Sequence, residues 1–286
     1  MFYAYGITEQ GTYHKKQNMV CQDAHNIVKR GDMVFAAVAD GLGSEDYSDV
    51  ASKMAVEIST GHCAEKITTA SQQNEILQTI KSSFLLAQNG IEKKALSDGH
   101  DINQYDTTLT VAVIRNDTLY YGHSGDSGII ALTTEGLYEK VTLQQRDEDN
   151  NVFPLYFKEK WVFGKYEKKV CSVLLATDGI LEAFFPVYIR KEPIDVYVAL
   201  ARFFMDNRNL RIHEVGEDMV KEQMKDFIQN IPDAQINDDK TAVVLINSVM
   251  ESALQADDYY KEPDWAELKR KFDEEWKRQA YPHLFE

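Results

Sequence analysis

Cysteine is scarce in this chain, and no long apolar run is present. Three cysteines, Cys21, Cys63 and Cys171, are spread over 286 residues and form no CxxC pair. A disulfide framework or a zinc site needs a denser set, so neither is expected and a reducing compartment is indicated. No stretch reaches the apolar length that spans a bilayer. Residues 1–6 lack the basic region and apolar core of a signal peptide, so we expect a cytoplasmic location without membrane contact.

Basic residues are also in deficit. The sequence has 31 Lys and Arg against 46 Asp and Glu, which gives a formal net charge of −15. A field of this sign repels nucleic acids and anionic membranes. No nucleic acid partner is therefore expected, and a manganese-dependent nuclease is disfavoured because the chain offers no basic track for a nucleic acid backbone. Solubility accounts for most of the negative charge, and metal cations are expected to neutralise part of it.

Hydrophobic residues make up 44% of the chain, enough for a sizeable core in one large domain. Runs rich in Val, Ile, Leu, Thr and Tyr predict strands at residues 33–39, 107–114, 118–121, 128–133, 170–176 and 241–246. Helical spacing of apolar residues predicts helices at 50–67, 76–96, 196–204 and 215–231. Because the strands do not alternate regularly with helices, this order predicts an α+β fold with largely antiparallel sheets.

Two internal segments need separate predictions. Residues 119–132 are interrupted by Gly122-His123-Ser124-Gly125-Asp126, which predicts a hairpin or a sharp connection between strands. Residues 146–169 are aromatic and charged without clear periodicity. They predict an irregular and mobile insert.

The composition changes after Ser248. Asp264 and Glu267 are spaced for a helix capping box, and a helical apolar face follows at Trp265, Leu268, Phe272 and Trp276. We therefore expect a domain at residues 1–248 and a C-terminal extension at residues 249–286 with an amphipathic helix. This helix packs on the domain or on a partner, and the first alternative is favoured.

Four aspartates stand where predicted strands begin or end: Asp40, Asp126, Asp178 and Asp238. A single Asp beside Gly after a strand is usually only a turn. Carboxylates at the ends of buried strands nevertheless need hydrogen bonds or cations. Hard oxygen ligands from several strand ends, with glycines that let carbonyls approach, suit Mg²⁺ or Mn²⁺.

Six short segments follow one another over about residues 3–247. They are Cys21-Gln22-Asp23-Ala24, Val38-Ala39-Asp40-Gly41-Leu42-Gly43-Ser44, Thr107-Thr108-Leu109, Gly122-His123-Ser124-Gly125-Asp126-Ser127, Ala176-Thr177-Asp178-Gly179-Ile180 and Asp238-Asp239-Lys240-Thr241-Ala242-Val243-Val244. In this order they resemble the metal-dependent protein phosphatases, the PPM or type 2C serine/threonine family, particularly its compact bacterial branch. Each segment alone is a weak match, whereas the ordered set is specific.

The resemblance implies a four-layer α-β-β-α sandwich with two central, mainly antiparallel β-sheets and a metal cluster at one end. It also implies a protein serine/threonine phosphatase that hydrolyses phosphomonoesters by in-line attack of a metal-bridging water. The cofactors would be two Mn²⁺ or Mg²⁺ ions with a weaker third, and the partner would be a phosphorylated protein. A catalytically weak or inactive pseudophosphatase that acts as a binding or sensor module is the alternative.

Site residues follow from the resemblance position by position. Asp40 would bridge two metals, Gly41 would offer its carbonyl, and Asp178 and Asp238 would complete the ligands of one metal. These three aspartates would act in catalysis through metal-bound water. Asp126, together with Asp178, corresponds to the weaker third site. Asp23 would act largely through metal-bound water.

The chain departs from the family at the residues expected to contact substrate. Many members carry a phosphate-binding Arg where this chain has Asn18, which offers no cationic fork. His14, Lys15 and Lys16 lie just upstream, and His14 is the preferred substitute for phosphate binding; an exposed loop histidine is the alternative. Leu42 replaces a His seen in some members, so metal-bound water would protonate the leaving group.

Three further positions have a structural interpretation or none. Gly128 replaces an Arg that follows Gly-Asp-Ser in many relatives, and little cost is expected. Asp106 replaces a common Gly, and no reason for this change is evident from the sequence. Cys21 beside the site is interpreted as a small buried packing residue rather than a redox-sensitive thiol.

A serine protease is a further alternative. Gly61-His62-Cys63 and Gly125-Asp126-Ser127-Gly128 look like its histidine and nucleophile segments, in the right order. His62 falls in a helical pattern, however, and paired cysteines are missing, so this alternative is disfavoured.

Overall fold

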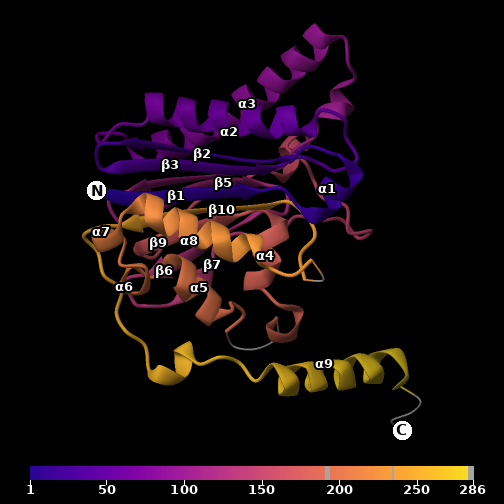
Figure 1. Cartoon of the computed structure of the whole chain (residues 1–286). Helices are drawn as coiled ribbons and strands as arrows, with labels where there is room; N and C mark the ends of the chain where they lie inside the picture. The colour runs from indigo at the N-terminus through magenta and orange to yellow at the C-terminus, as the bar shows by residue number, and fades with distance from the viewer. Residues whose placement is uncertain (191–193, 234, 283–286) are drawn as a thin grey trace.

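The protein forms two stacked β-sheets. The computed structural model describes residues 1–190, 194–233 and 235–282 (Figure 1). One sheet has the strand order β1-β10-β9-β6-β7 and the other β2-β3-β4-β5-β8, and every strand pair in them is antiparallel. The first sheet consists of β1 (Phe2–Glu9), β10 (Lys240–Asn247), β9 (Val170–Ala176), β6 (Gly128–Thr133) and β7 (Tyr138–Lys140). The second consists of β2 (Asp23–Arg30), β3 (Met33–Asp40), β4 (Leu109–Arg115), β5 (Thr118–Ser124) and β8 (Val162–Lys165).

Helices cover both outer faces. The long helices α2 (Ser48–Lys66) and α3 (Gln73–Asp98) lie on the second sheet, and the first sheet is covered mainly by α4 (Asp178–Phe184), α5 (Val198–Met205) and α8 (Glu217–Gln229) (Figure 1). Short elements connect them: α1 (Thr12–Gln17), α6 (Asn207–Leu210), α7 (Ile212–Val215) and the 3₁₀ turns η1 (Ile102–Tyr105), η2 (Lys158–Lys160), η3 (Val187–Ile189) and η4 (Asp257–Tyr260). Helix α9 (Trp265–Ala280) follows at the C-terminal end.

Strand β3 shows why the layers form. Successive side chains of a strand point to opposite faces of its sheet. Phe35 and Ala37 pack toward α2 and α3, whereas Val34 and Ala36 belong to the core between the two sheets. The run from Met33 to Ala39 is apolar throughout because both of its faces are buried. A third core lies between the first sheet and its helices. The predicted four-layer α-β-β-α sandwich is thereby confirmed.

The predicted strands and long helices are all present, within a few residues of their expected ends. The strands β1, β2, β7 and β8 were not predicted. The hairpin alternative for residues 119–132 is wrong, because β5 lies in one sheet and β6 in the other. Residues 146–169 are irregular only in part, since β8 pairs with β5 along the sheet edge.

The chain after Ser248 runs along the first sheet before α9 begins. The Ala253 amide donates to the Thr134 carbonyl, and the Tyr138 amide donates to the Tyr259 hydroxyl. Helix α9 begins as expected, with the Asp264 carboxylate accepting a hydrogen bond from the Glu267 amide.

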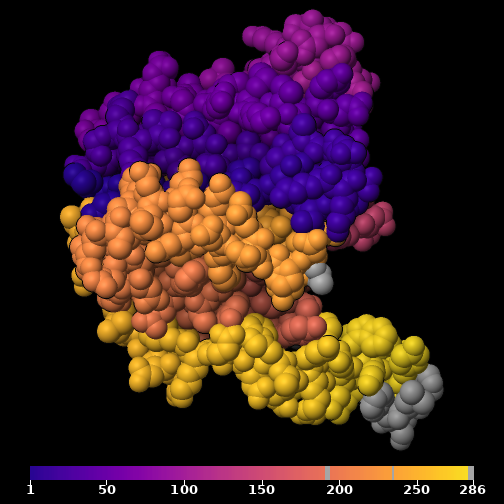
Figure 2. Space-filling view, in the orientation of Figure 1, coloured from indigo at the N-terminus to yellow at the C-terminus, as the bar shows by residue number. Residues whose placement is uncertain are grey.

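Helix α9 makes few contacts with the rest of the molecule. Phe272 packs edge-on against Tyr188 and Trp265 against Tyr197, with ring centroids 5.4 and 4.9 Å apart. Trp276 remains 55% exposed, and the C-terminal half of α9 extends past the domain (Figure 2). None of the described helices is long and apolar enough to cross a membrane.

Candidate metal centre

The predicted acidic residues meet at one end of the sandwich. In antiparallel sheets the start of one strand lies beside the end of its neighbour. Asp40 ends β3 and is the register partner of Asp23, which starts β2. Asp126 lies between β5 and β6, and Asp178 follows β9 as the first residue of α4. The alternating strand directions bring carboxylates from distant parts of the chain to a common edge.

Three of these carboxylates form a compact cluster. Oxygen atoms of Asp40, Asp126 and Asp178 all lie within 4.8 Å of one another. Asp238 lines the same cleft, which has a volume of about 440 Å³, although its side chain is 56% exposed. Asp23 lies deeper, and its Oδ2 accepts a hydrogen bond of 2.8 Å from the Thr177 hydroxyl. The sequence therefore identified a group of residues that the fold does bring together.

The backbone around Asp40 is fixed by the neighbouring strand. The Thr108 hydroxyl accepts from the Asp40 amide at 2.9 Å, and the Thr108 amide donates to the Asp40 carbonyl at 2.8 Å. The Gly41 amide donates to the Gln22 carbonyl, and a Cβ atom on Gly41 would lie 2.6 Å from the Ser48 carbonyl oxygen. This position needs glycine because helix α2 begins directly against it.

The cluster carries more negative charge than its surroundings compensate. Burial raises the pKa of Asp40 well above its ordinary value, and the nearby Asp23 and Asp178 carboxylates raise it further. The pKa of Asp23 is raised in the same way, mainly by burial. Burial also raises the pKa of Asp126, to about 7, with repulsion from Asp178 added and attraction to Arg146 opposing it. The pKa of Asp238 is raised as well, first by burial.

Three buried carboxylate oxygens lack a hydrogen-bond partner within the described part of the chain: Oδ1 of Asp23 and both oxygens of Asp126, of which Oδ2 forms an ion pair with Arg146. Buried carboxylates without hydrogen bonds or cations are costly. An oxygen-only set of crowded aspartates is the donor set that Mg²⁺ and Mn²⁺ prefer. The residues of this cleft therefore fit divalent cations.

Arg146 also lies in the centre, although no motif in the sequence indicates it. Its Nη2 atom is 2.5 Å from Asp126 Oδ2 and 3.0 Å from Asp178 Oδ2. It belongs to the segment expected to be a mobile insert, in which nothing distinguished it from the neighbouring charged residues. Only the path of the folded chain places it against the two aspartates.

His14 is buried, so the alternative of an exposed loop histidine is wrong. Its Nδ1 atom lies 2.8 Å from Asp239 Oδ2, and its Nε2 atom lies 3.9 Å from Asp238 Oδ1. Asp239 also accepts hydrogen bonds from the amides of Gly11 and Gln22. The sequence did not single out Asp239, which fixes His14 at the wall of the cleft.

Asn18 has a structural reason. It adopts a left-handed conformation with φ 55° and ends helix α1, where its amide donates to the carbonyls of His14 and Lys15. Asparagine tolerates this conformation far better than most residues. Lys15 and Lys16 are exposed, and Lys16 pairs with Asp233 at 3.4 Å.

Three other positions singled out in the sequence are Asp106, Cys21 and Leu42. The carbonyl of Asp106 accepts from the Leu42 amide, and burial raises the pKa of the Asp106 carboxyl to about 6. Cys21 is half-buried rather than fully buried, and burial together with the Asp239 and Asp23 carboxylates raises its thiol pKa. A raised pKa disfavours the reactive thiolate. The structure shows no reason for Leu42 itself.

The protease alternative is wrong. His62 lies on helix α2, where its Nε2 is 3.0 Å from the Ser82 hydroxyl. Ser127 is fully buried between the sheets and contacts Thr108. A nucleophile and its base must lie within hydrogen-bond reach, and these two residues belong to different layers.

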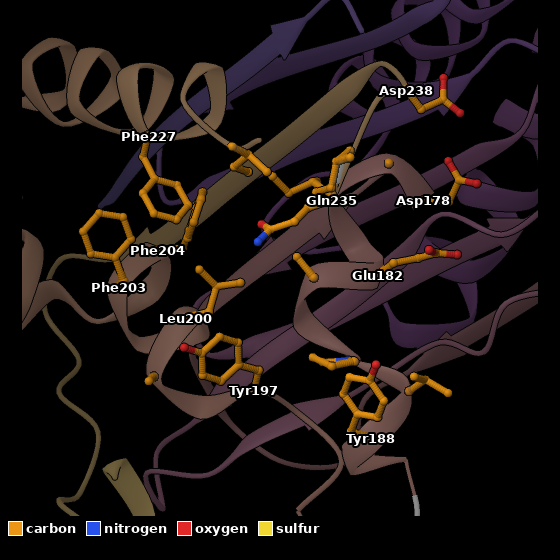
Figure 3. A pocket seen from close by; sticks show the side chains of 18 of the residues that line it. Asp178, Glu182, Tyr188, Tyr197, Leu200, Phe203, Phe204, Phe227, Gln235 and Asp238 are labelled. Atoms are coloured by element: carbon orange, nitrogen blue, oxygen red, sulfur yellow. The ribbon is translucent and has the colours of Figure 1, made fainter. Parts of the chain in front are cut away.

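A larger hollow adjoins the acidic cleft. It has a volume of about 900 Å³ and shares Asp178 and Asp238 with the cleft. Figure 3 shows these two carboxylates at one end and a row of apolar side chains leading away from them. We call it the apolar groove; among its lining residues are Tyr188, Tyr197, Leu200, Phe203, Phe204, Phe227 and Trp265.

The chain belongs to the protein phosphatase 2C family. The sequence profile of that family, described as Protein phosphatase 2C, matches residues 10–229, which is more than half of the chain. The match covers all the aspartates of the centre except Asp238.

Solved structures share the fold. A bacterial serine phosphatase is 14% identical with a TM-score of 0.60, and the match covers 89% of this chain and 100% of that one. Stp1, a serine/threonine phosphatase from Staphylococcus aureus, is 14% identical with a TM-score of 0.59, covering 87% and 96%. The S. agalactiae serine/threonine phosphatase is 15% identical with a TM-score of 0.58, covering 86% and 99%. At such identities the likeness shows the fold. No curated protein matches the sequence.

Proposed function

We propose that this protein is a metal-dependent protein serine/threonine phosphatase. The observation that carries the proposal is the meeting of Asp40, Asp126 and Asp178 within 4.8 Å in a protein of this family. Unpartnered carboxylate oxygens and raised pKa values support a site built for cations. The cytoplasmic location expected from the sequence stays a prediction.

Asp40, Asp178 and Asp238, with the Gly41 carbonyl, would hold two Mn²⁺ or Mg²⁺ ions. Asp126 with Asp178 would contribute to a third position, and Asp23 would act through water. The chemistry supplied by ions bound there would be neutralisation of the charge of a phosphate monoester and activation of water for attack at phosphorus.

The protein's own residues hold this arrangement in place. Thr108 fixes the backbone of Asp40, and Thr177 orients the Asp23 carboxylate. The His14 Nδ1 atom lies 2.8 Å from Asp239 Oδ2, and its Nε2 atom lies on the side of the cleft and of Asp238. His14 is therefore proposed to bind the substrate phosphate in place of the arginine missing at Asn18.

The apolar groove supports a protein substrate rather than a small phosphate ester. It runs on from the acidic cleft through the shared residues Asp178 and Asp238 (Figure 3). Phe203 and Phe227 in its wall are 39% and 38% exposed. Apolar surface beside a phosphate site suits the chain around a phosphorylated residue, because it buries side chains that a small ester lacks.

A pseudophosphatase is the second candidate. Asn18 and Leu42 replace groups that contact substrate in relatives, and Arg146 occupies part of the acidic cluster. Such a protein would bind cations and phosphorylated partners without hydrolysis.

One experiment separates these candidates. Purified protein is incubated with an aryl phosphate while Mn²⁺ is titrated against a chelator, and Mn²⁺ binding is measured calorimetrically on the same sample. We expect hydrolysis that requires Mn²⁺. Asp40→Asn should lower hydrolysis and Mn²⁺ affinity by more than about 100-fold, because even residues that only support metal ligands commonly cost about 10–100-fold. Binding without hydrolysis would favour the pseudophosphatase, and no binding would end the proposal.

A further inference from the structure

Arg146 places a positive charge inside the acidic cluster. One nitrogen atom of its guanidinium lies within hydrogen-bond distance of both Asp126 and Asp178. Asp126 is 1% exposed, and the Arg146 side chain is 23% exposed. An ion pair at this depth is held strongly, because removal of one partner leaves an uncompensated buried charge.

Neighbouring hydrogen bonds determine where Arg146 lies. The Gln145 amide donates to the Gly125 carbonyl at 2.9 Å, and the Gln145 side chain accepts from the Gly125 amide at 3.0 Å. Gly125 precedes Asp126, so these two bonds set residue 146 beside the carboxylate. Arg146 and Val152 then pair across a short turn. The arginine is thus positioned by its backbone as well as by the charges that it meets.

A divalent cation and a guanidinium cannot share the same carboxylate oxygens. Both are positive, and at hydrogen-bond distances from common oxygens they repel each other strongly where water is scarce. The Oδ2 atoms of Asp126 and Asp178 can therefore serve either Arg146 or an ion. Asp40 and Asp238 make no ion pair with Arg146 among the described contacts.

We propose that the Arg146 guanidinium competes with a divalent cation for the carboxylate oxygens that it contacts on Asp126 and Asp178. A cation binds these oxygens only when Arg146 moves away. The unaltered protein therefore binds its weakest ion with low affinity. The identity of the ions rests on the proposed function, whereas the competition concerns this arginine alone.

The test is Mn²⁺ titration calorimetry on the whole protein and on Arg146→Gln. We expect the variant to bind its weakest ion about tenfold more tightly, or to show a binding event that the unaltered protein lacks, because the competing charge is gone. Arg146→Lys keeps the charge and should stay close to the unaltered protein. Lys158→Gln is the matched control, since it removes a positive charge from the same segment without touching the cluster.

Melting temperatures provide a second readout that does not depend on activity. With chelator present, Arg146→Gln should melt at a lower temperature than the unaltered protein, because Asp126 loses its partner. With saturating Mn²⁺ this difference should disappear or reverse. A variant that melts lower by the same amount in both conditions would show a merely structural arginine.

The outcomes separate this inference from the proposed function. If Arg146→Gln and the unaltered protein bind Mn²⁺ with the same stoichiometry and affinity, the competition is wrong and the metal-dependent function stands. If neither protein binds Mn²⁺, the proposed function is wrong and the inference fails with it.

Discussion

At the scale of single residues, the proposed phosphate-binding role of His14 depends on the position of its ring. Its Nδ1 is held by Asp239, and both side chains are buried. Because one ring nitrogen faces the Asp239 carboxylate at 2.8 Å, the other ring nitrogen is left toward the cleft. Asp239 in turn accepts hydrogen bonds from two backbone amides, which fix the position of its carboxylate.

We predict that His14→Ala raises the KM for a phosphorylated peptide about tenfold with a smaller effect on kcat. A hydrogen bond to a charged phosphate is worth about 1.5–3 kcal/mol, and each 1.4 kcal/mol is about tenfold in affinity. Steady-state kinetics at saturating Mn²⁺ measure this. His213→Ala, at an exposed histidine on α7, is the control. An unchanged KM in His14→Ala would remove His14 from phosphate binding.

The raised pKa values predict how the metal-free protein responds to pH. In the folded protein burial raises the pKa of Asp126 to about 7 from the ordinary 3.8, and burial also raises the pKa values of Asp23 and Asp40. Between about pH 4 and 7 the folded state therefore holds protons that the unfolded chain releases. The free energy of unfolding must then fall as the pH rises through this window.

With chelator present, we expect the melting temperature to decrease from about pH 5 to 7. Mn²⁺ should stabilise the protein more at the upper end of this range, since a cation competes with protons for the carboxylates. Asp126→Asn should flatten the decrease. A melting temperature that rises steadily over this range in the chelated protein would contradict the charge crowding.

At the scale of elements, the backbone at the start of helix α4 packs closely against the backbone at the start of strand β10. A Cβ atom on Gly179 would lie 2.0 Å from the Asp239 carbonyl oxygen. Gly179 follows Asp178, and Asp239 follows Asp238, so this backbone contact sets the separation of two proposed ligands. Glycine is needed here because two backbone segments approach each other closely. A turn is not the reason, since Gly179 is not among the glycines with a positive φ.

Gly179→Ala is therefore predicted to destabilise the protein by about 1–3 kcal/mol, the usual cost of forcing extra atoms into a packed site. It should also weaken Mn²⁺ binding, because Asp178 and Asp238 move apart. Chemical denaturation and calorimetry measure the two effects. Gly61→Ala is the matched control: Gly61 lies in α2 with open space at its Cβ position, so the change should stabilise by about 0.5–1 kcal/mol. Equal effects of the two substitutions would refute the contact.

The apolar groove is formed by α4, α5 and α8 together, which leave Phe203 and Phe227 in contact but partly exposed. We predict that Phe203→Ser raises the KM for a phosphopeptide with apolar flanking residues about tenfold, since burial of a large apolar side chain is worth about 1.5–3 kcal/mol. Hydrolysis of an aryl phosphate should not change. Leu96→Ser, at an 81% exposed position on α3, is the control. Equal effects on both substrates would argue against the groove as a peptide site.

At the scale of the whole molecule, the contacts made by the chain after Ser248 bear on where the domain ends. The expected boundary at Ser248 stays a prediction, and the chain beyond it differs in its contacts. Residues 249–263 include Tyr259 and Tyr260, which pack on the core beneath the first sheet, and Ser252, which bonds Arg208. Helix α9 contributes no buried residue.

We predict that a chain ending at residue 263 keeps its melting temperature and its aryl phosphatase activity. A chain ending at Ser248 should melt several degrees lower, because a loss of about 1 kcal/mol shifts the melting temperature by about 2–4 °C in a domain of this size. Thermal denaturation of the two shortened chains measures this. If removal of α9 alone lowers the melting temperature as much, the helix belongs to the domain.

The sequence by itself determined the α+β class with antiparallel sheets, and its resemblance to the family implied the four layers and the proposed metal ligands. The run from Met33 to Asp40 is apolar on both faces and ends in a carboxylate, and this local pattern already specifies a central strand with a polar end. The ordered motifs indicate Asp40, Asp126 and Asp178 without any knowledge of the fold. Strands β2 and β8 escaped prediction because edge strands bury less of their surface, which leaves a weak pattern.

Only the tertiary structure decided what surrounds the aspartates. Arg146 reaches the centre because Gln145 bonds Gly125, and His14 is buried beside the Asp239 carboxylate. Both contacts join parts of the chain that are about 20 residues or far more apart. Such contacts depend on which strand ends meet and leave no periodicity in the sequence. The charge balance at the proposed metal site, and with it the number of ions it accepts, is therefore a property of the folded molecule.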